Sequence, residues 1–369
     1  MRFLLVVPPL AGHVAPLRGV ASVLSSRGHQ VAWCGPCPEL STLVSGRVFP
    51  AGDSAPFAVS RRPPGLRGFA ALKYLWESYL VPLADAMVPG VAAAVADFAP
   101  DVVVVDQQAM AGALVASRCG LPWATSASTS TELADPLGAL PKIASWVAEL
   151  QAGLRARHGV RLGDLRFSPH LVLAFTTRAL AGESRRAVSY VGPALPAAAA
   201  GWSLVDDRPL VVVTLGTSNA MAGARFLAES VDALAGMPSV RGLVVDPTGS
   251  LVSESVTLAR RIPQVAVFAR ASVVVCHGGH NTVCEALSAG VPLVVAPIRD
   301  DQSMLAQQVV AASAGVRLRF DRAKAADIRA AIESAEQCRP GAAKIRESFE
   351  AAGGAEEAAT RLESLLGRD

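Results

Sequence analysis

Short, almost continuously apolar runs recur along the chain, each followed by a longer amphipathic stretch. In the first half these runs are FLLVV (3–7), QVAWC (30–34), DVVVVD (101–106) and LVLAF (171–175). Apolar residues on both faces of a strand are typical of a parallel sheet that helices cover on both sides. The pattern predicts an α/β domain with a parallel sheet.

The same pattern then restarts with LVVVTLG (210–216), RGLVVD (241–246), ASVVVCH (271–277) and PLVVAP (292–297). We therefore predict two Rossmann-like, doubly wound domains, at 1–195 and 209–350, joined by a Pro- and Ala-rich linker at 196–208. Residues 351–369 are expected to continue as a C-terminal helix. Two such domains facing across a cleft would bind ligands at the carboxyl ends of their strands.

The length, charge and apolar runs of the chain limit the classes of function that it could have. A length of 369 residues suits two domains, and a net charge of +3 gives no reason to expect a nucleic-acid partner. The apolar run at the N-terminus is broken by Pro8 and Pro9, and no later run reaches the ~18 apolar residues of a membrane helix. We expect a cytoplasmic protein that is not integral to a membrane. Its oligomeric state stays open, with a homodimer among the possibilities.

The string WCGPC (33–37) raises the alternative of a thiol oxidoreductase acting through Cys34 and Cys37. A reactive pair needs its first thiol at a helix N-terminus within a small redox domain. No independent domain of about 100 residues can be separated around this string. We interpret Cys34 as a filler at a strand end and Cys37 as a turn residue.

The stretch CHGGHNTVCEALSAGVPLVVAPIRDDQ (276–302) has the features of an anion site. A strand ends in a Gly-Gly turn and a helix follows, so free backbone N–H groups and the positive end of a helix dipole meet there. Glu285 lies one turn into the helix, where its carboxylate could accept hydrogen bonds from ribose hydroxyls. After the next strand, Asp301 and Gln302 combine a carboxylate with an amide, which suits the hydroxyls of a hexose.

This stretch, H-G-G-H-N-T-V-C-E followed by G-V-P and D-Q, resembles the donor-binding signature of nucleotide-sugar-dependent glycosyltransferases of the GT-B fold, the family of plant secondary-metabolite and bacterial antibiotic enzymes. The resemblance implies a nucleotide-sugar cosubstrate and no further cofactor. It also implies that Glu285 holds the ribose, that Asp301 and Gln302 hold the sugar, and that the diphosphate contacts His277, Gly278, Gly279, Asn281 and Thr282. In relatives a terminal helix crosses back to the first domain, as 351–369 would here.

Two further segments match the donor site of that family. Gln264 matches the glutamine of the nucleobase segment, whereas Ile262 stands where plant members have a Trp that stacks on uracil. This departure favours a dTDP-sugar over a UDP-sugar. Thr217 and Ser218, in the loop GTSN, match the segment that faces the diphosphate, although they would equally suit the start of a capped helix.

The N-terminal half is expected to supply the base. His13 follows the first apolar strand, and imidazole is the side chain whose ordinary pKa best suits proton transfer near neutrality. Family members place a catalytic His at this position. Asp106 ends another strand, where its carboxylate could fix the imidazole tautomer and stabilise the imidazolium.

Trp76 and Tyr79 lie in a less regular region, 50–97, and are candidates for an acceptor-binding wall. The alternative is a helix that packs its own apolar stripe.

The sequence therefore predicts an inverting, metal-independent glycosyltransferase acting on a hydroxyl of a small lipophilic natural product. No acidic cluster with Mg²⁺-like spacing accompanies the phosphate site. Alternatives are a lipid-acceptor N-acetylglucosaminyltransferase, a nucleotide-sugar epimerase and a non-catalytic nucleotide-sugar binder. The acceptor, the sugar and the attacking atom stay open.

Overall fold

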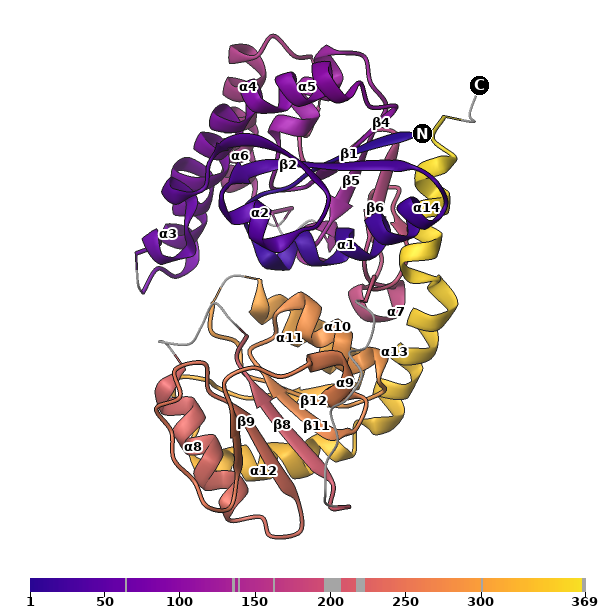
Figure 1. Ribbon diagram of the computed structural model, residues 1–369. Helices are drawn as coiled ribbons and strands as arrows, with labels where there is room; N and C mark the ends of the chain where they lie inside the picture. The colour runs from indigo at the N-terminus through magenta and orange to yellow at the C-terminus, as the bar shows by residue number, and fades with distance from the viewer. Residues whose placement is uncertain are drawn as a thin grey trace. The chain divides into compact units, whose positions relative to one another are not determined.

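A computed structural model describes residues 1–63, 65–134, 137–138, 140–161, 163–195, 207–216, 223–299 and 301–366. The chain divides into two compact units (Figure 1). Unit 1 comprises Met1–Phe175, Glu183–Ala194 and Ala352–Asp369, and unit 2 comprises Thr176–Gly182 and Leu195–Ala351. Most of the predicted linker, residues 196–206, lies outside the described part of the chain.

One segment departs from the predicted domain boundaries. Residues Thr176–Gly182 follow the last long strand of unit 1 but belong to unit 2. Their short helix α7 (Arg178–Ala181) packs on α11 (Gln302–Ala311), and Leu180 is buried in the core of unit 2. Thr177 also hydrogen-bonds Ser348, with 2.9 Å between the two hydroxyl oxygens. This assignment depends on tertiary contacts, which a strand pattern does not reveal.

Unit 1 is built on a seven-stranded parallel sheet of order β3-β2-β1-β4-β5-β6-β7. The strands are β1 (Arg2–Val6), β2 (Gln30–Cys37), β3 (Arg47–Asp53), β4 (Val102–Asp106), β5 (Trp123–Ala127), β6 (Leu171–Ala174) and β7 (Ser189–Tyr190). The sequence pattern predicted β1, β2, β4 and β6 and missed the other three. Except for the added seventh strand, the order is that of a doubly wound sheet.

Both faces of this sheet are buried, as the continuous apolar runs predicted. Along β1, Leu4 and Val6 lie in one core cluster, whereas Phe3 and Leu5 lie in another. The first cluster is covered by α4 (Val81–Phe98) and α5 (Ala111–Arg118), and the second by α1 (Ala11–Ser26) and α14 (Gly354–Glu363). Helix α14 lies beside α1, so the C-terminal segment packs on unit 1 (Figure 1).

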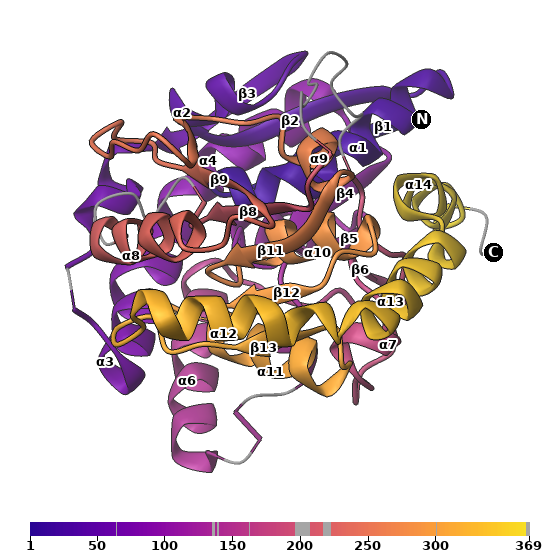
Figure 2. The same cartoon turned by 90° about the horizontal axis from the view of Figure 1, so that it is seen from below.

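Unit 2 is also built on a parallel sheet, here with six strands in the order β10-β9-β8-β11-β12-β13. Its strands are β8 (Leu210–Thr214), β9 (Arg241–Val245), β10 (Thr257–Ala259), β11 (Ala271–Cys276), β12 (Leu293–Val295) and β13 (Gly315–Arg317). The helices are α7, α8 (Ala224–Ala235), α9 (Gln264–Phe268), α10 (His280–Ser288), α11, α12 (Ala325–Glu336) and α13 (Arg339–Ala352). Figure 2 shows α12 running along β12 and β13, with which it is in contact.

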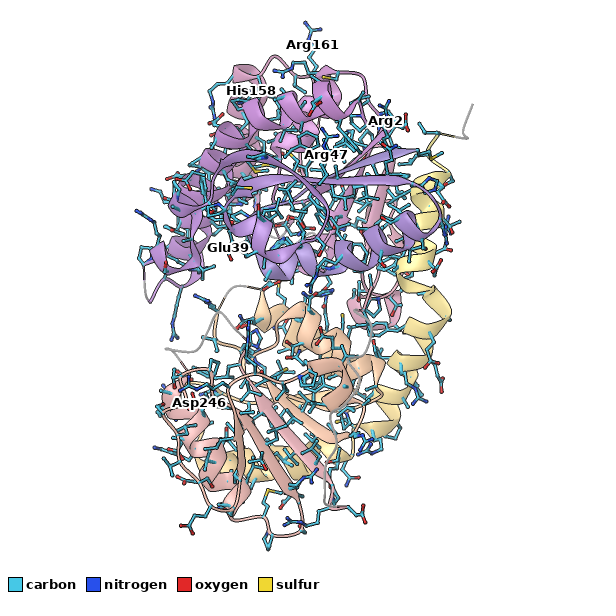
Figure 3. All side chains as sticks on the ribbon, viewed as in Figure 1. Arg2, Glu39, Arg47, His158, Arg161 and Asp246 are labelled. Carbon is cyan, nitrogen blue, oxygen red and sulfur yellow. The ribbon has the colours of Figure 1, made fainter. Side chains whose placement is uncertain are left out.

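The remaining elements of unit 1 are shorter helices and turns, together with one longer helix, α6. They are α2 (Glu39–Leu43), the 3-10 turns Ala55–Phe57, Val59–Arg61 and Thr131–Ala134, α3 (Gly68–Lys73), a π-helical stretch Tyr74–Leu80 and α6 (Pro141–Arg157). The arginine Arg47, which begins β3 (Figure 3), lies over the rings of Phe49 and Phe98.

The continuous helix Gly68–Phe98 is the one stretch, among the residues searched, that is long and apolar enough to cross a membrane. Length and composition alone are weak evidence. Its residues Leu83, Met87 and Val91 are fully buried in the core of unit 1, and α4 packs on β3 and α5. A core helix has the same apolar composition.

Candidate active site

The carboxyl edge of the unit 1 sheet brings His13 and Asp106 together. Strand β4 ends at Asp106, and α1 begins at Ala11, a few residues after β1. Because β1 and β4 are neighbouring parallel strands, the segments that follow them meet at the same edge. His13 Nδ1 lies 2.9 Å from Asp106 Oδ1, and the Asp106 side chain is fully buried. The sequence predicted this pair.

Ser128 is a third member of the cluster, which the sequence analysis missed. Its hydroxyl donates to Asp106 Oδ2 at 2.7 Å, and its oxygen lies 2.7 Å from His13 Nδ1. The backbone N–H of Gln108 donates to Asp106 Oδ1 at 2.9 Å. Ser128 follows β5, so a prediction of that strand would have brought it to the same edge as Asp106.

These distances define the tautomer of His13. An ionised carboxylate only accepts hydrogen bonds, so the close approach of Nδ1 to Asp106 Oδ1 requires a proton on Nδ1. Ser128 donates to the other carboxylate oxygen, so its own oxygen can share the Nδ1 proton. The neutral ring therefore carries its lone pair on Nε2. An imidazole in this form is suited to act as a base through Nε2.

In unit 2 a tight turn connects β11 to α10, as the sequence predicted. Gly278 has φ +86°, a conformation that glycine adopts without strain, and Gly279 is the N-cap of α10. A Cβ on Gly279 would overlap His277 Nε2. The backbone can therefore pass close to the His277 ring, and the first N–H groups of the nine-residue helix α10 follow at once.

His277 is 8% exposed, and its Nδ1 has no hydrogen-bond partner in the part of the chain that is described. Burial, with a smaller effect from the positive charge of Arg299, lowers the pKa of His277 to about 4. The ring is therefore neutral at neutral pH. It could interact with an anion as a neutral hydrogen-bonding group rather than as a cation.

Three of the predicted donor-binding residues form one hydrogen-bonded group between α9 and α10. Gln264 Nε2 donates to Glu285 Oε2 at 2.5 Å and lies 3.3 Å from Thr282 Oγ1. These bonds orient the Glu285 carboxylate, which is only partly buried. Asn281 directly precedes Thr282 on α10 and is also partly buried, as is Ile262 near the start of α9.

In the loop after β12, the side-chain oxygen of Gln302 accepts hydrogen bonds from the backbone of that loop. Gln302 Oε1 accepts from the backbone N–H groups of Ile298 at 2.9 Å and Arg299 at 3.0 Å. The NH2 group is thus the part of Gln302 suited to contact a ligand. Asp301 is the N-cap residue of α11. Thr217 and Ser218 lie outside the described residues.

Asp246, at the end of β9 (Figure 3), has a structural role that the sequence did not suggest. Its carboxylate accepts from the backbone N–H groups of Thr248 at 3.0 Å and Leu251 at 2.9 Å. These bonds hold the loop after β9 at the carboxyl edge of the unit 2 sheet.

The prediction for Trp76 requires a correction. Its ring is 1% exposed and belongs to the core of unit 1, with the guanidinium of Arg166 5.4 Å from the ring centre. A ring buried to this extent is not available to line an acceptor site. Tyr79, three residues further along the π-helical stretch, is only partly buried.

The thiol interpretation fails on local structure. Cys34, the first thiol of WCGPC, lies inside strand β2 and not at a helix N-terminus, and Cys37 is the last residue of that strand rather than a turn residue. Cys34 is fully buried, and burial raises the pKa of its thiol to about 12. A thiol of this kind is almost entirely protonated at neutral pH, so it is a poor nucleophile.

Across the described segments, no three His, Cys, Asp or Glu side chains are grouped as metal ligands would be.

Comparisons with known proteins show which sequences and structures this chain resembles. Residues 245–365 match the family model "Erythromycin biosynthesis protein CIII-like, C-terminal domain". Two relatives match nearly the whole chain. The 4'-demethylrebeccamycin synthase of Lentzea aerocolonigenes is 29% identical, and the match covers 99% of this chain and 99% of the relative. The NDP-glycosyltransferase YjiC of Bacillus subtilis is 26% identical, and the match covers 97% of this chain and 95% of the relative.

Among solved structures, CalG4, the calicheamicin glycosyltransferase, superposes with a TM-score of 0.81 at 23% identity, covering 100% of this chain and 98% of its own. The glycosyltransferase VinC in complex with dTDP has a TM-score of 0.75 at 18% identity and covers both chains completely. These likenesses establish the GT-B fold with its two Rossmann-like domains.

The chain is a glycosyltransferase of the GT-B fold. It is similar to the glycosyltransferases of antibiotic biosynthesis, and residues 245–365 are similar to the C-terminal domain of the erythromycin biosynthesis protein CIII-like family.

Proposed function

We propose that this glycosyltransferase moves a sugar, with inversion, from a dTDP-sugar to a hydroxyl of a small lipophilic natural product, and that His13 is the base. The observation that carries the proposal is the contact of 2.9 Å between His13 Nδ1 and Asp106 Oδ1. The named relatives act in sugar transfer, and several structural neighbours are described with thymidine diphosphate or an aglycone.

The reaction is a single displacement at the anomeric carbon. The acceptor oxygen attacks that carbon while His13 Nε2 takes its proton, and the bond from the carbon to the diphosphate oxygen breaks with its electron pair. Asp106 stabilises the imidazolium that forms, because its carboxylate accepts the Nδ1 proton in a hydrogen bond. Attack opposite the leaving group inverts the configuration.

The leaving diphosphate would be stabilised by the N-terminus of α10 and the loop before it. Backbone N–H groups after Gly279 and the neutral His277 supply hydrogen bonds, and the helix dipole favours the negative charge. We propose that these groups serve without a metal ion. Glu285, held by Gln264, would accept from the ribose hydroxyls.

The first experiment is calorimetric titration of the full chain with dTDP and with UDP, both in excess EDTA. We expect micromolar binding of dTDP, weaker binding of UDP, and a loss of at least tenfold in affinity in Glu285→Ala. Glu254→Ala removes an exposed carboxylate from the same unit and is the matched control. Absence of binding by either nucleotide would contradict the donor site, and a requirement for Mg²⁺ would contradict metal independence.

The second experiment separates catalysis from binding. His13→Ala should abolish turnover of a dTDP-sugar while leaving dTDP affinity unchanged, whereas His170→Ala, which removes an exposed histidine of unit 1, should retain turnover. A non-catalytic binder would show no turnover in wild type. An epimerase would convert the nucleotide sugar without an acceptor.

A further inference from the structure

The imidazole ring of His277 contacts the segment that follows the neighbouring strand, β8. Strands β8 and β11 pair in parallel with Thr214 opposite Cys276, so the segments after them start side by side (Figure 1). His277 is the first residue after β11, and Gly216 is the second residue after β8. The two segments meet where the His277 ring lies against the backbone of Gly216.

Gly216 leaves room for this ring because it has no side chain. A Cβ on Gly216 would lie 2.9 Å from Cε1 of His277 and 3.3 Å from its Nε2. Two carbon atoms at 2.9 Å overlap, so the ring would have to move. A Cβ on Gly279 would lie only 2.4 Å from the same Nε2, and the His277 residue is 8% exposed, so the ring has little free space to move into. The bare backbone at both glycines therefore fixes where the ring lies.

The two nitrogens of the His277 ring have different surroundings. Nδ1 is closed to solvent and has no hydrogen-bond partner in the described structure. A buried N–H without an acceptor is rarer in proteins than a buried acceptor without a donor, so the proton of the neutral ring belongs on Nε2. Nε2 lies beside Gly279, the N-cap of α10, where the free backbone N–H groups of that helix begin. The Nε2–H group is thus a side-chain donor next to backbone donors.

We propose that Gly216 is a positioning residue, whose bare backbone lets the His277 ring take the orientation in which Nε2–H donates to the leaving diphosphate. The inference rests on the proposed function. It adds the nitrogen that donates, the tautomer of the ring and the residue that fixes the ring in place. The tautomer is opposite to that of His13, which carries its proton on Nδ1 and accepts a second one on Nε2.

A substitution at Gly216 would have two effects that need to be separated. Gly216 has φ +68°, a conformation that favours glycine whatever surrounds it, so an alanine there strains the backbone as well as displacing the ring. Gly290 has φ +69°, and a Cβ there would have its nearest neighbour 3.5 Å away, on the side chain of Arg346. Gly290→Ala therefore has the same backbone strain without the close contact, and it is the matched control.

The test measures dTDP affinity by calorimetry in a double-mutant cycle. Both Gly216→Ala and His277→Ala should bind dTDP about tenfold more weakly than wild type, the loss expected when a hydrogen bond to a charged group is removed. In the His277→Ala background, Gly216→Ala should change the affinity by less than about twofold, because no ring is left to displace. Gly290→Ala should bind dTDP within about twofold of wild type, because it lies apart from the ring.

A second measurement needs only a folded wild-type protein. ¹⁵N NMR distinguishes a protonated from an unprotonated ring nitrogen, and the signals of His277 are identified by their loss in His277→Gln. At neutral pH we expect the proton on Nε2, and addition of dTDP should shift the Nε2 signal more than the Nδ1 signal. A proton on Nδ1 in the free protein would overturn the proposal, even if Gly216→Ala failed to fold.

The calorimetry can overturn the positioning role in three ways. These are a dTDP affinity unchanged in Gly216→Ala or in His277→Ala, an equal loss on Gly216→Ala with and without the His277 ring, and a similar loss in Gly290→Ala. None of these results affects the proposed function, which depends on dTDP binding by wild type and on the loss of turnover in His13→Ala. Absence of dTDP binding by wild type would instead remove the function itself.

Discussion

The hydroxyl of Ser128 donates to Asp106 Oδ2 at 2.7 Å, whereas His13 Nδ1 lies 2.9 Å from the other oxygen, Oδ1. Asp106 is thus held through both oxygens, and the serine oxygen also lies 2.7 Å from His13 Nδ1. Ser128 itself is 2% exposed. We interpret it as a positioning residue, which acts on the base through the carboxylate.

Removal of this hydroxyl should make His13 more basic. In Ser128→Ala the Asp106 carboxylate loses one donor, so its negative charge is less compensated and stabilises the imidazolium more strongly. This effect should outweigh the loss of the serine oxygen near Nδ1, because a charged acceptor stabilises the imidazolium more than a neutral one. We expect the pKa of His13 to rise, measured by ¹⁵N NMR of the imidazole ring as a function of pH in the free protein. Ser126→Ala is the matched control, because it removes a buried hydroxyl that has no hydrogen-bond partner in the described structure from β5, the strand that Ser128 follows. An unchanged His13 titration in Ser128→Ala would remove Ser128 from the network.

The isosteric change Asp106→Asn should be more damaging to turnover than to binding. The amide NH2 can donate to His13 Nδ1, which would favour the tautomer with its proton on Nε2, the wrong form for a base. We expect kcat to fall by roughly 10² to 10⁴, the range of a general base and its orienting acid. The dTDP affinity measured by calorimetry should not change. A variant that retained more than a tenth of wild-type kcat would show that the tautomer of His13 does not limit the reaction.

The sequence predicted the fold and the His13–Asp106 pair because both depend on strongly apolar strands. β1 and β4 consist almost entirely of Val, Leu and Phe, so their ends could be located and the residues that follow them compared. β3 contains Pro50 and Gly52, and β5 has the sequence WATSA with two hydroxyl residues. Neither resembles a buried strand. Ser128 was missed because it follows β5.

The proposed donor residues were found for another reason: most of them lie within one continuous stretch, 276–302, so their order alone suggests a common site. The order of residues along the chain does not reveal tertiary contacts, such as the hydrogen bond of 2.5 Å from Gln264 Nε2 to Glu285 Oε2. Trp76 was misplaced because an aromatic residue on an amphipathic helix has the same pattern whether its ring is in a binding wall or in a core. Packing distinguishes the two, and here it buries the ring.

The cysteines of the native protein should differ sharply in their reaction with Ellman's reagent. Cys119 is exposed and should react fast, whereas Cys34 is fully buried with its pKa raised by burial and should not react until the chain unfolds. Cys34→Ser should therefore release the same amount of chromophore as wild type under native conditions, and one equivalent less in denaturant. Fast labelling of Cys34 in the native protein would restore the thiol interpretation.

The buried, neutral state of His277 should make stability depend on pH in a defined window. The pKa of His277 is about 4 in the folded chain and about 6.5 when unfolded, so between these values the unfolded chain binds more protons. The free energy of unfolding therefore falls as the pH is lowered from 6.5 towards 4, by on the order of 3 kcal/mol for a shift of this size.

The variant His277→Gln has no imidazole that can bind this proton. Its unfolding midpoint relative to wild type should rise steadily as the pH is lowered through this window, as measured by calorimetry. His170→Gln, at an exposed position, should follow wild type. A constant difference between His277→Gln and wild type from pH 7 to pH 4 would mean that His277 titrates normally and is accessible to protons in the fold.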